Sequence, residues 1–468
     1  MSSQGNPLKM MDLIINEGLI AATKDIAGIL IFLVILGILV ALINRTGAAA
    51  AFGRWAQKNI KSRTGAVLAT FILGVLIFID DYFNCLTVGG VMQPVTDANK
   101  ISRAKLAYLI DATAAPICMI APISSWAAAV AEFSKGTGYN GLDLFIRAIP
   151  FNFYSLLTFI FVLGITFLKL DFGPMARHER NAIMNGDLFT EGGEVDGGAK
   201  PLENAQGRFL DMLMPVIILI IICVLALLRV GGWCETLEDG SVKGFIDAFG
   251  DTDATTALPW GALIALVLAV VYLNGRRVIT FKEAMKCVPE GFNAMVPAIL
   301  ILCLATSLKN MTGLLELKEY IAELMENGAS SLGNFLPAVI FLVACVLAFA
   351  TGTSWGTFGI LIPIVCNIFE PTSPLLIIGM SACLAGAVCG DHCSPISDTT
   401  IMSSAGAKCQ HINHVSTQLP YAITVAAVSF IGFLLSGFIQ NWYVVFPITV
   451  VLMLAFLVGL KYAQKKSV

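Results

Sequence analysis

Residues 384–406 place ionisable side chains where an uninterrupted apolar segment would be expected. The stretch LAGAVCGDHCSPISDTTIMSSAG is flanked by apolar runs long enough to lie in a lipid bilayer. Asp391, His392 and Asp398 are therefore expected at membrane depth. An ionisable group there costs at least about 2.5 kcal/mol and usually faces a cavity or a partner rather than lipid. The stretch is predicted to form part of a functional site inside a membrane.

Three further apolar segments are interrupted by polar residues, around residues 79–84, 111–125 and 350–357. Glycine and proline at such breaks free backbone carbonyls from helical hydrogen bonding, and a small hard cation such as Na+ is bound by carbonyl, hydroxyl and carboxylate oxygens. The four breaks together suit a dehydrated cation. The candidate ion-binding or substrate-binding residues are Asp80, Asp81, Asn84, Ser124, Thr351, Thr353, Ser354, Asp391, Ser397, Asp398 and Thr399.

Asp81 and Asp398 are the expected Na+ ligands, and Asp111 and His392 are candidate proton relays. Burial in a low dielectric disfavours an ionised carboxylate, so a cation and a proton compete for it. If a carrier reorients only when it is loaded, this competition couples Na+ and H+ movement in opposite directions. The residues therefore indicate alternating-access exchange of the two ions.

Structural roles stay open for several of these acids. Asp80 and Asp81 would lie about 100° apart on a helix, so both face one cavity only if the backbone unwinds. One of them could instead cap the N-terminus of a half-helix. Asp391 could equally pair with His392 or cap the adjoining half-helix.

Composition limits the class of protein. Of 468 residues, 57% are hydrophobic and 13% charged, with mean hydropathy +0.81, whereas a soluble domain has about 25% charged residues. The sequence therefore predicts an all-α polytopic membrane protein whose surroundings are the lipid bilayer. The net charge of −3 and the absence of a long basic run give no sign of nucleic-acid binding. No cofactor is expected.

Enzymatic and zinc-binding interpretations of residues 389–394 are weak. His392 with Cys389 and Cys393 lacks the second Cys/His cluster that a structural zinc site needs. A hydrolase would need Ser394 or Cys393 as the nucleophile and His392 as the base, and adjacent residues seldom align for that chemistry. We therefore expect that the protein is not an enzyme.

Charge bias and hydropathy predict nine crossings and two re-entrant hairpins, the hairpins at residues 65–97 and 335–369. Loops rich in Lys and Arg mark the cytoplasmic side, which places the C-terminus in the cytoplasm. His411 and His414 fall in a cytoplasmic loop, where they are expected to be solvated or to sense pH. The predicted crossings are residues 26–43, 105–131, 149–170, 209–229, 258–274, 294–308, 374–406, 418–439 and 443–460.

Two halves of the chain resemble each other. LINRTG at 42–47 resembles LKNMTG at 308–313, GVMQP at 90–94 resembles GILIP at 359–363, and PIS recurs at 122–124 and 395–397. The first hairpin is predicted to enter from the cytoplasm and the second from outside, which gives inverted-topology repeats with discontinuous helices. The predicted organisation is 1–25, an N-terminal segment without a removable signal peptide; 26–170, first repeat; 171–208, cytoplasmic linker; 209–274, connecting helices; 275–440, second repeat; 441–468, last helix and tail.

The motifs FIDDYFNCLTVGGVMQPVTD (78–97), ATGTSWGTFGILIPI (350–364) and GDHCSPISDTTIMSSAG (390–406) resemble those of NhaC-type Na+/H+ antiporters in the wider ion-transporter superfamily. The resemblance covers most of residues 26–440 and implies a bacterial or archaeal inner-membrane antiporter that forms a homodimer, with a scaffold holding a moving transport domain. The family's pattern usually begins with further apolar helices ahead of the stretch found here. Its members include exchangers of small organic anions such as malate and lactate. A Na+- or H+-coupled exchanger of organic anions or amino acids is therefore the alternative function.

Overall fold

The computed structural model describes residues 6–78, 80–134, 140–193, 207–236, 242–245, 248, 252–314, 333–370 and 372–466. Ile79 at the first predicted break, and residues 194–206 of the predicted linker, lie outside these ranges. The β structure within them is one antiparallel bridge between Thr236 and Val242. The prediction of an all-α protein is confirmed.

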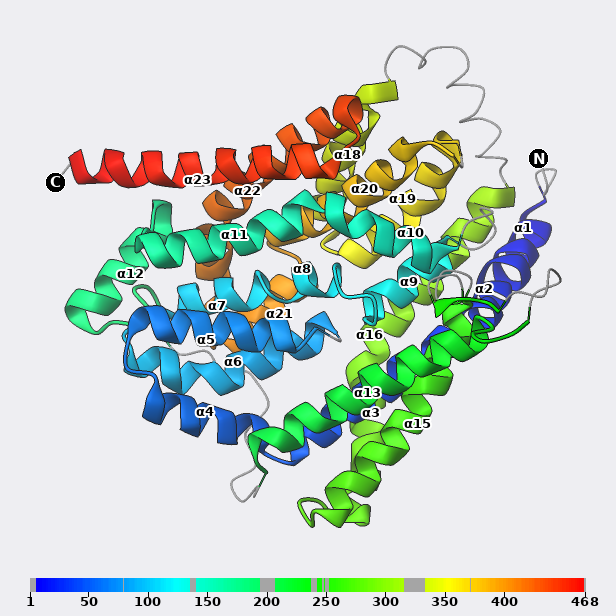
Figure 1. The fold of residues 1–468 in the computed structure, drawn as a ribbon, viewed down its shortest axis with the longest axis horizontal. Helices are drawn as coiled ribbons and strands as arrows, with labels where there is room; N and C mark the ends of the chain where they lie inside the picture. Colours follow the sequence, from blue (N-terminus) through cyan, green and yellow to red (C-terminus); the bar gives the residue numbers. More distant parts are fainter. Residues whose placement is uncertain are drawn as a thin grey trace.

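Figure 1 shows the helices in chain order, from blue at the N-terminus to red at the C-terminus. In chain order they are α1 (Pro7–Leu13), the π-helical segment η1 (Ile14–Ile20), α2 (Ala21–Asp25), α3 (Ala27–Arg45), α4 (Ala48–Asn59), α5 (Arg63–Leu76), α6 (Asp81–Ala98), α7 (Arg103–Asp111), α8 (Ala115–Cys118), α9 (Ser125–Phe133), α10 (Gly141–Ala148), the 3-10 turn η2 (Ile149–Phe151), α11 (Phe153–Leu168), α12 (Gly173–Asn185), α13 (Phe209–Val230), α15 (Ala254–Gly275), α16 (Phe281–Leu314), the 3-10 turn η3 (Gly333–Phe335), α18 (Leu336–Thr351), α19 (Ser354–Ile368), α20 (Pro374–Cys393), α21 (Asp398–Gly406), α22 (His411–Ile439) and α23 (Trp442–Lys466).

Seven helices of the described residues are long and apolar enough to cross a membrane, and the bent pair Gly141–Phe151 and Phe153–Leu168, with a 43° angle, makes an eighth if it counts as one span. The protein is therefore a multi-pass membrane protein. The predicted crossing 105–131 is divided among α7, α8 and α9, each too short to span alone. Residues 333–351, predicted as half of a hairpin, are by themselves long enough to span.

The helices form two groups that Figure 1 separates clearly. In one group, α3 packs against α15 and α16, and α15 also packs against α13. The other group holds the interrupted helices of both repeats, together with α11, α12, α22 and α23. The opening helix of each repeat, α3 or α16, thus belongs to one group and its broken helices to the other.

The two repeats have the same order of elements: an opening helix, a hairpin of two helices, a broken crossing and a closing helix. These are α3, α5–α6, α7–α9 and α11 in the first copy, and α16, α18–α19, α20–α21 and α22 in the second. In this order α6 corresponds to α19, and α21 corresponds to α9. A two-fold relation then requires that the contact of α6 with α21 be repeated by α19 with α9, and both contacts are present. The opening helices contact each other, and so do the closing helices. This confirms the predicted architecture of inverted repeats with discontinuous helices.

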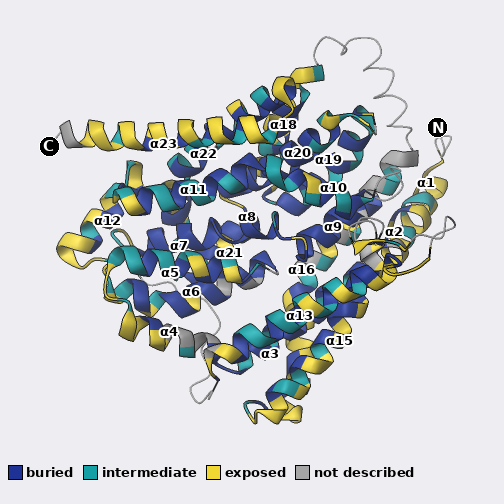
Figure 2. Ribbon diagram, in the orientation of Figure 1, coloured by how far each residue is buried: buried dark blue, intermediate teal, exposed yellow. Residues whose placement is uncertain are grey.

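The most buried segments lie in the middle of the second group (Figure 2). All nine residues of α7 are buried, as are nearly all residues of α20. By contrast, α23 leaves most of its apolar side chains exposed, as a lipid-facing helix does. The polar residues of α7, α20 and α21 therefore face protein rather than lipid.

Local sequence explains the interruptions. Gly352 ends α18 with φ +69°, a left-handed conformation that favours glycine, and a Cβ there would lie 2.6 Å from the Ile396 carbonyl oxygen. Thr353 and Ser397 then cap α19 and α21, accepting from the Gly356 and Thr400 N–H groups. These caps satisfy backbone donors that water cannot reach at membrane depth.

Candidate ion-binding site

The break between α5 and α6 is organised by one amide side chain. The Asn84 Nδ2 group donates to the backbone carbonyls of Gly74 at 2.7 Å, Ile77 at 2.9 Å and Thr113 at 2.9 Å. These carbonyls belong to the C-terminal end of α5 and to the turn after α7, so Asn84 ties both interruptions of the first repeat together. Its Oδ1 atom is buried and has no hydrogen-bond partner among the described residues.

Asp80 and Asp81 lie four and three residues before Asn84 and are fully buried. Asp81 is the first residue of α6, so the backbone is not helical at Asp80 and the two carboxyl groups are not fixed about 100° apart. Neither carboxylate oxygen of Asp81 has a hydrogen-bond donor among the described residues. Asp81 and Asn84 are three residues apart on α6, which places both on one face.

The second repeat surrounds its carboxylates with hydroxyl groups. Ser354 Oγ at the start of α19 and Thr399 Oγ1 at the start of α21 each donate to Asp391 Oδ2 at 2.9 Å. Tyr82, from the first repeat, donates to Asp398 Oδ2 at 2.5 Å. Asp398 Oδ1 accepts from the Thr399 backbone N–H at 2.8 Å. The two carboxylates are thus held by three different helices.

The acids of both repeats converge. Asp81 interacts electrostatically with Asp80 and with Asp398, and Asp391 interacts with Asp398 and Asp111. All of them are fully buried except Asp398, which is half-buried. A group of buried like charges is unfavourable unless protons or cations neutralise it.

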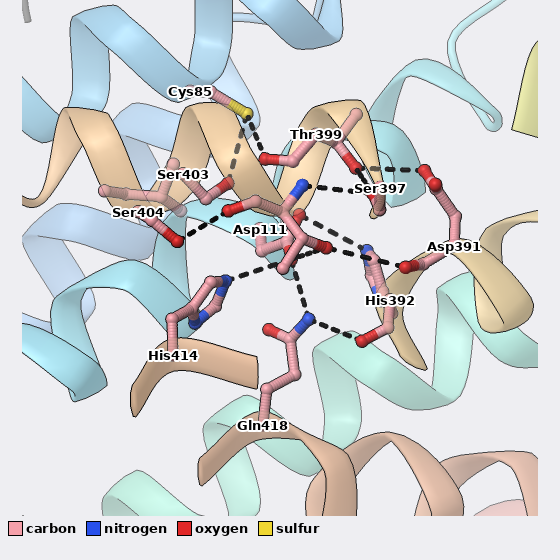
Figure 3. Close-up of polar contacts among 12 residues, drawn as sticks. Cys85, Asp111, Asp391, His392, Ser397, Thr399, Ser403, Ser404, His414 and Gln418 are labelled. Carbon is pink, nitrogen blue, oxygen red and sulfur yellow. Dashed lines mark hydrogen bonds and ion pairs between the residues drawn. The ribbon is translucent and has the colours of Figure 1, made fainter. Parts of the chain in front are cut away.

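A second polar cluster surrounds Asp111 at the end of α7 (Figure 3). Asp111 Oδ2 accepts from Thr400 Oγ1 at 3.1 Å and from Gln418 Nε2 at 2.7 Å, and it lies 3.2 Å from His414 Nε2. His392 Nε2 is 3.9 Å from Asp111 Oδ1, too far for a direct hydrogen bond. The two candidate proton relays are therefore neighbours without direct contact.

The ring orientation of His392 follows from its other partner. The Tyr154 hydroxyl lies 3.1 Å from His392 Nδ1. If this hydroxyl donates, the proton of neutral His392 sits on Nε2 and faces Asp111, which is the favourable arrangement.

Three of the predicted site residues hydrogen-bond to residues nearby in the chain rather than to a buried carboxylate. Ser124 Oγ caps α9 by accepting from the Ala127 N–H and donates to the Cys118 and Ala121 carbonyls. Thr353 caps α19. Thr351 is exposed and donates to the Leu347 carbonyl at 2.8 Å. Ser397, the cap of α21, lies 3.2 Å from Thr399 Oγ1 and so stays within the hydroxyl cluster.

The prediction that His411 and His414 are solvated is wrong for His414. Helix α22 begins at His411 rather than near residue 418, and His414 is fully buried against Asp111. Sequence analysis also missed Tyr82, Tyr154 and Gln418. One signal was available, because His414 and Gln418 are four residues apart and so form a polar stripe on one helix face.

No three His, Cys, Asp or Glu side chains among the described residues come close enough together to hold a metal ion. The zinc interpretation therefore finds no support. A Na+ ion draws on a different donor set, in which carbonyl, amide and hydroxyl oxygens complement one or two carboxylates. Among the described residues, the buried acceptors without a donor include Asp81 Oδ1, Asp81 Oδ2, Asn84 Oδ1 and Asp391 Oδ1, and, in the cluster around Asp111, Asp111 Oδ1 and Gln418 Oε1.

Inverted repeats, interrupted helices and buried acids between the repeats define a secondary transporter. A model of the Na+/H+ antiporter family matches residues 107–438. The chain therefore belongs to the Na+/H+ antiporter family, and the resemblance found in its motifs is confirmed.

The chain is also similar to two other proteins in sequence and to one solved structure in fold. An uncharacterized protein of Haemophilus influenzae (strain ATCC 51907 / DSM 11121 / KW20 / Rd) is 38% identical over 442 residues, which cover 92% of this chain and 83% of that protein. The malate-2H(+)/Na(+)-lactate antiporter of Bacillus subtilis (strain 168) is 28% identical over 195 residues, 40% of each chain. The crystal structure of the Alcanivorax borkumensis YdaH transporter, described as having an unusual topology, superposes with a TM-score of 0.58 at 13% identity, covering 90% of this chain and 88% of that one.

Proposed function

We propose that this secondary transporter exchanges Na+ for H+ by alternating access, with the two ions competing for the carboxylates of Asp81, Asp391 and Asp398. The observation that carries the proposal is the set of buried acceptor oxygens without donors on Asp81, Asn84 and Asp391. Leaving such oxygens unpaired costs about 1 to 3 kcal/mol each. A cation or a proton relieves that cost, and both cannot occupy one oxygen.

The ligands of Na+ come from both repeats in this proposal. Asp81 and the Asn84 Oδ1 atom contribute from α6, and one carboxylate of the pair Asp391 and Asp398 contributes from the break between α20 and α21, so that two carboxylates bind one ion. Ser354, Ser397 and Thr399 hold the second pair of carboxylates in place. A site shared by two repeats supports alternating access, because moving one group of helices past the other opens it to either side.

Proton flux in proteoliposomes tests the exchange. Imposing a Na+ gradient on vesicles that contain the parent protein should change the internal pH, and Asp81→Asn or Asp398→Asn should slow this at least about 100-fold, as expected when a positioned charge is removed. Thr351→Ala is the matched control, since Thr351 is exposed and its hydroxyl bonds to the Leu347 carbonyl and the Thr357 hydroxyl rather than to a carboxylate. Unchanged exchange in both aspartate variants would reject this site.

A second candidate function is exchange of small organic anions coupled to Na+ or H+. The similarity of about two fifths of the chain to the malate-2H(+)/Na(+)-lactate antiporter favours it. The N-termini of α9 and α21, where backbone N–H groups could bind an organic carboxylate, weigh against it, because Ser124 and Ser397 already cap them. Uptake of labelled malate and lactate, with and without a Na+ gradient, separates the two functions, since a pure cation exchanger ignores both acids.

The proposal also includes the predicted setting of the protein: the inner membrane of a bacterium or archaeon, the C-terminus in the cytoplasm and a homodimer. The last helix leads into Lys461, Lys465 and Lys466, which favours the cytoplasmic side. A cysteine placed after residue 466 should be labelled by a membrane-impermeant reagent in inverted vesicles only. Mass measurement of the purified protein in detergent tests the dimer.

A further inference from the structure

The surroundings of Asp111 favour an ionised carboxylate. Its Oδ2 atom accepts hydrogen bonds from Thr400 and Gln418 and faces the Nε2 atom of His414. Hydrogen bonds to a carboxylate oxygen stabilise its charged form. Asp111 is nevertheless fully buried.

The charge of Asp111 lacks a permanent counter-ion. No lysine or arginine in the part of the chain that the structure describes forms an ion pair with it. An uncompensated buried charge costs several kcal/mol. The neighbours that can supply a positive charge are His414 from α22, at 3.2 Å, and His392 from α20, at 3.9 Å.

His414 is the better carrier of this charge. Its Nε2 atom faces Asp111, so neutral His414 donates from Nε2 and leaves Nδ1 as the place for a second proton. That Nδ1 atom is buried and has no partner among the described residues. The charged or titratable groups that face His414 are Asp111 on α7 and His392 on α20, and the next one on its own helix is His411, whose ring contacts Ser404 and the Pro395 carbonyl.

Helix α21 connects this pair to the cation carboxylates. Thr399 donates to Asp391 and the next residue, Thr400, donates to Asp111 (Figure 3). Both hydroxyls lie in the first turn of one helix, so the two carboxylates keep a fixed spacing. A cation bound at Asp391 or Asp398 therefore adds positive charge close to His414 without touching it.

We propose that His414 carries an exchanged proton, with Asp111 as its counter-ion, at a site separate from the carboxylates that bind the cation. The inference rests on the proposed function and adds a second proton site to it. The proton at this site and the bound cation repel each other electrostatically. A bound cation disfavours the proton on His414, and by linkage a protonated His414 weakens cation binding by the same factor. Because this coupling is electrostatic, a proton on His414 weakens cation binding by a limited factor. Competition for one oxygen would instead exclude one of the two ions completely.

The test is Na+ binding by the purified full-length protein, followed as thermal stabilisation from about pH 5 to about pH 9, the range in which histidine changes charge. In the parent, the dissociation constant for Na+ should rise as the pH falls. In His414→Gln, which keeps a donor toward Asp111 but cannot hold the second proton, the plot of log Kd for Na+ against pH should become shallower. The decrease in slope should be at most one proton, because a coupling of finite size displaces less than a full proton. Asp111→Asn should reduce the slope equally, because the histidine then lacks its counter-ion.

His411→Gln is the matched control, since it removes a histidine of the same helix that does not face Asp111, and its slope should equal that of the parent. A parent slope retained in folded His414→Gln and Asp111→Asn overturns the inference. If neither variant folds, the parent protein alone decides. Its dissociation constant for Na+ is fitted against pH with a term for protonation of the cation-binding carboxylates. A further rise of this constant that levels off at low pH supports the inference, and the absence of that rise overturns it. Failure of the parent to bind Na+ at any pH would instead reject the proposed function.

Discussion

The two interruptions that meet at the centre of the protein are built from opposite chemistry. In the first repeat, an amide of Asn84 bridges three backbone carbonyls, and the neighbouring acid Asp81 has no donors. In the second repeat, hydroxyls of Ser354 and Thr399 bridge the acid Asp391, and α19 and α21 are capped by their own residues. The two repeats have related architecture, but their breaks are stabilised differently. A neutral amide donor joins the backbone at the first break, whereas hydroxyl groups surround a carboxylate at the second.

Two repeats with the same order of helices can therefore contribute different side-chain chemistry to one site. An amide nitrogen among converging carbonyls does what a cation would do there, so the carbonyls of the first break are satisfied without an ion, whereas the carboxylate of Asp81 is not. The second break satisfies only part of its carboxylate oxygens, as the buried and unpaired Asp391 Oδ1 atom indicates. We therefore expect ions to act on the carboxylates of both breaks and not on the bridged carbonyls of the first, and mutations that exchange these two chemistries test the contrast.

The largest effect is expected for Asn84→Asp, which makes the first break resemble the second. The variant replaces the bridging amide by a carboxylate that faces three carbonyl oxygens, so an added cation becomes necessary. In Na+-free buffer its midpoint of thermal unfolding should fall far below that of the parent, and saturating Na+ or Li+ should restore most of the loss.

Asn84→Ala is the control for that experiment. It leaves the carbonyls of Gly74, Ile77 and Thr113 without their donor and should cost at least about 3 kcal/mol, at about 1 to 3 kcal/mol for each unsatisfied buried group. Na+ should restore none of this loss, because alanine supplies neither a carboxylate nor the Asn84 Oδ1 ligand. Equal restoration of both variants by Na+ would contradict the role given to the amide.

A smaller loss is expected for Gly352→Ala at the second break. The left-handed backbone and the close Ile396 carbonyl should make this change cost about 2 to 3 kcal/mol. Gly90→Ala on α6 is the matched change, because a Cβ there meets nothing within 4 Å, and it should be neutral or stabilise by up to about 1 kcal/mol. Chemical denaturation in detergent compares the two, and similar losses would show that the break is not strained.

Ser354→Ala should have a moderate effect on stability and a clear one on ions. It removes one of two hydroxyl donors to Asp391 Oδ2, a loss of about 1 to 2 kcal/mol. With Asp391 less well held, the dissociation constant for Na+ should rise about tenfold, a change of about 1.4 kcal/mol. Sodium-dependent thermal stabilisation measures this, and an unchanged constant would remove Ser354 from the site.

The smallest effect is expected away from the membrane interior, at Glu179 on α12. Burial, together with the charge of Asp171, raises the pKa of this carboxyl, although Lys105 and Arg63 oppose the change. A raised pKa in the folded state means that the stabilisation is complete below the ordinary glutamate pKa and declines as the pH rises to the raised value.

The unfolding midpoint of the parent, measured relative to Glu179→Gln, should accordingly fall with rising pH and then level off. Glutamine keeps an acceptor for the Ser102 N–H, which bonds Glu179 at 2.8 Å. A constant difference between the two proteins across the acidic range would show that Glu179 titrates normally.

Several features of the fold could be predicted from the chain alone. Helical hydrophobic segments, the polar breaks near residues 80, 352 and 396, and the repeated order of elements follow from composition and from short motifs, because a bilayer requires every backbone group to be bonded within a helix. The acids Asp80, Asp81, Asp391 and Asp398 stood out for the same reason: a buried charge in an apolar run is rare.

The sequence by itself thus determined the class of fold, the places where helices break and the acids between them. Only the tertiary structure decided that Asn84 bridges carbonyls, that Tyr82 reaches across to Asp398, and that His414 and Gln418 meet Asp111. The physical reason is the range of the interactions. Hydropathy and helix breaking act between neighbours along the chain, whereas these bonds join residues from 7 to more than 300 positions apart, through the packing of the two repeats.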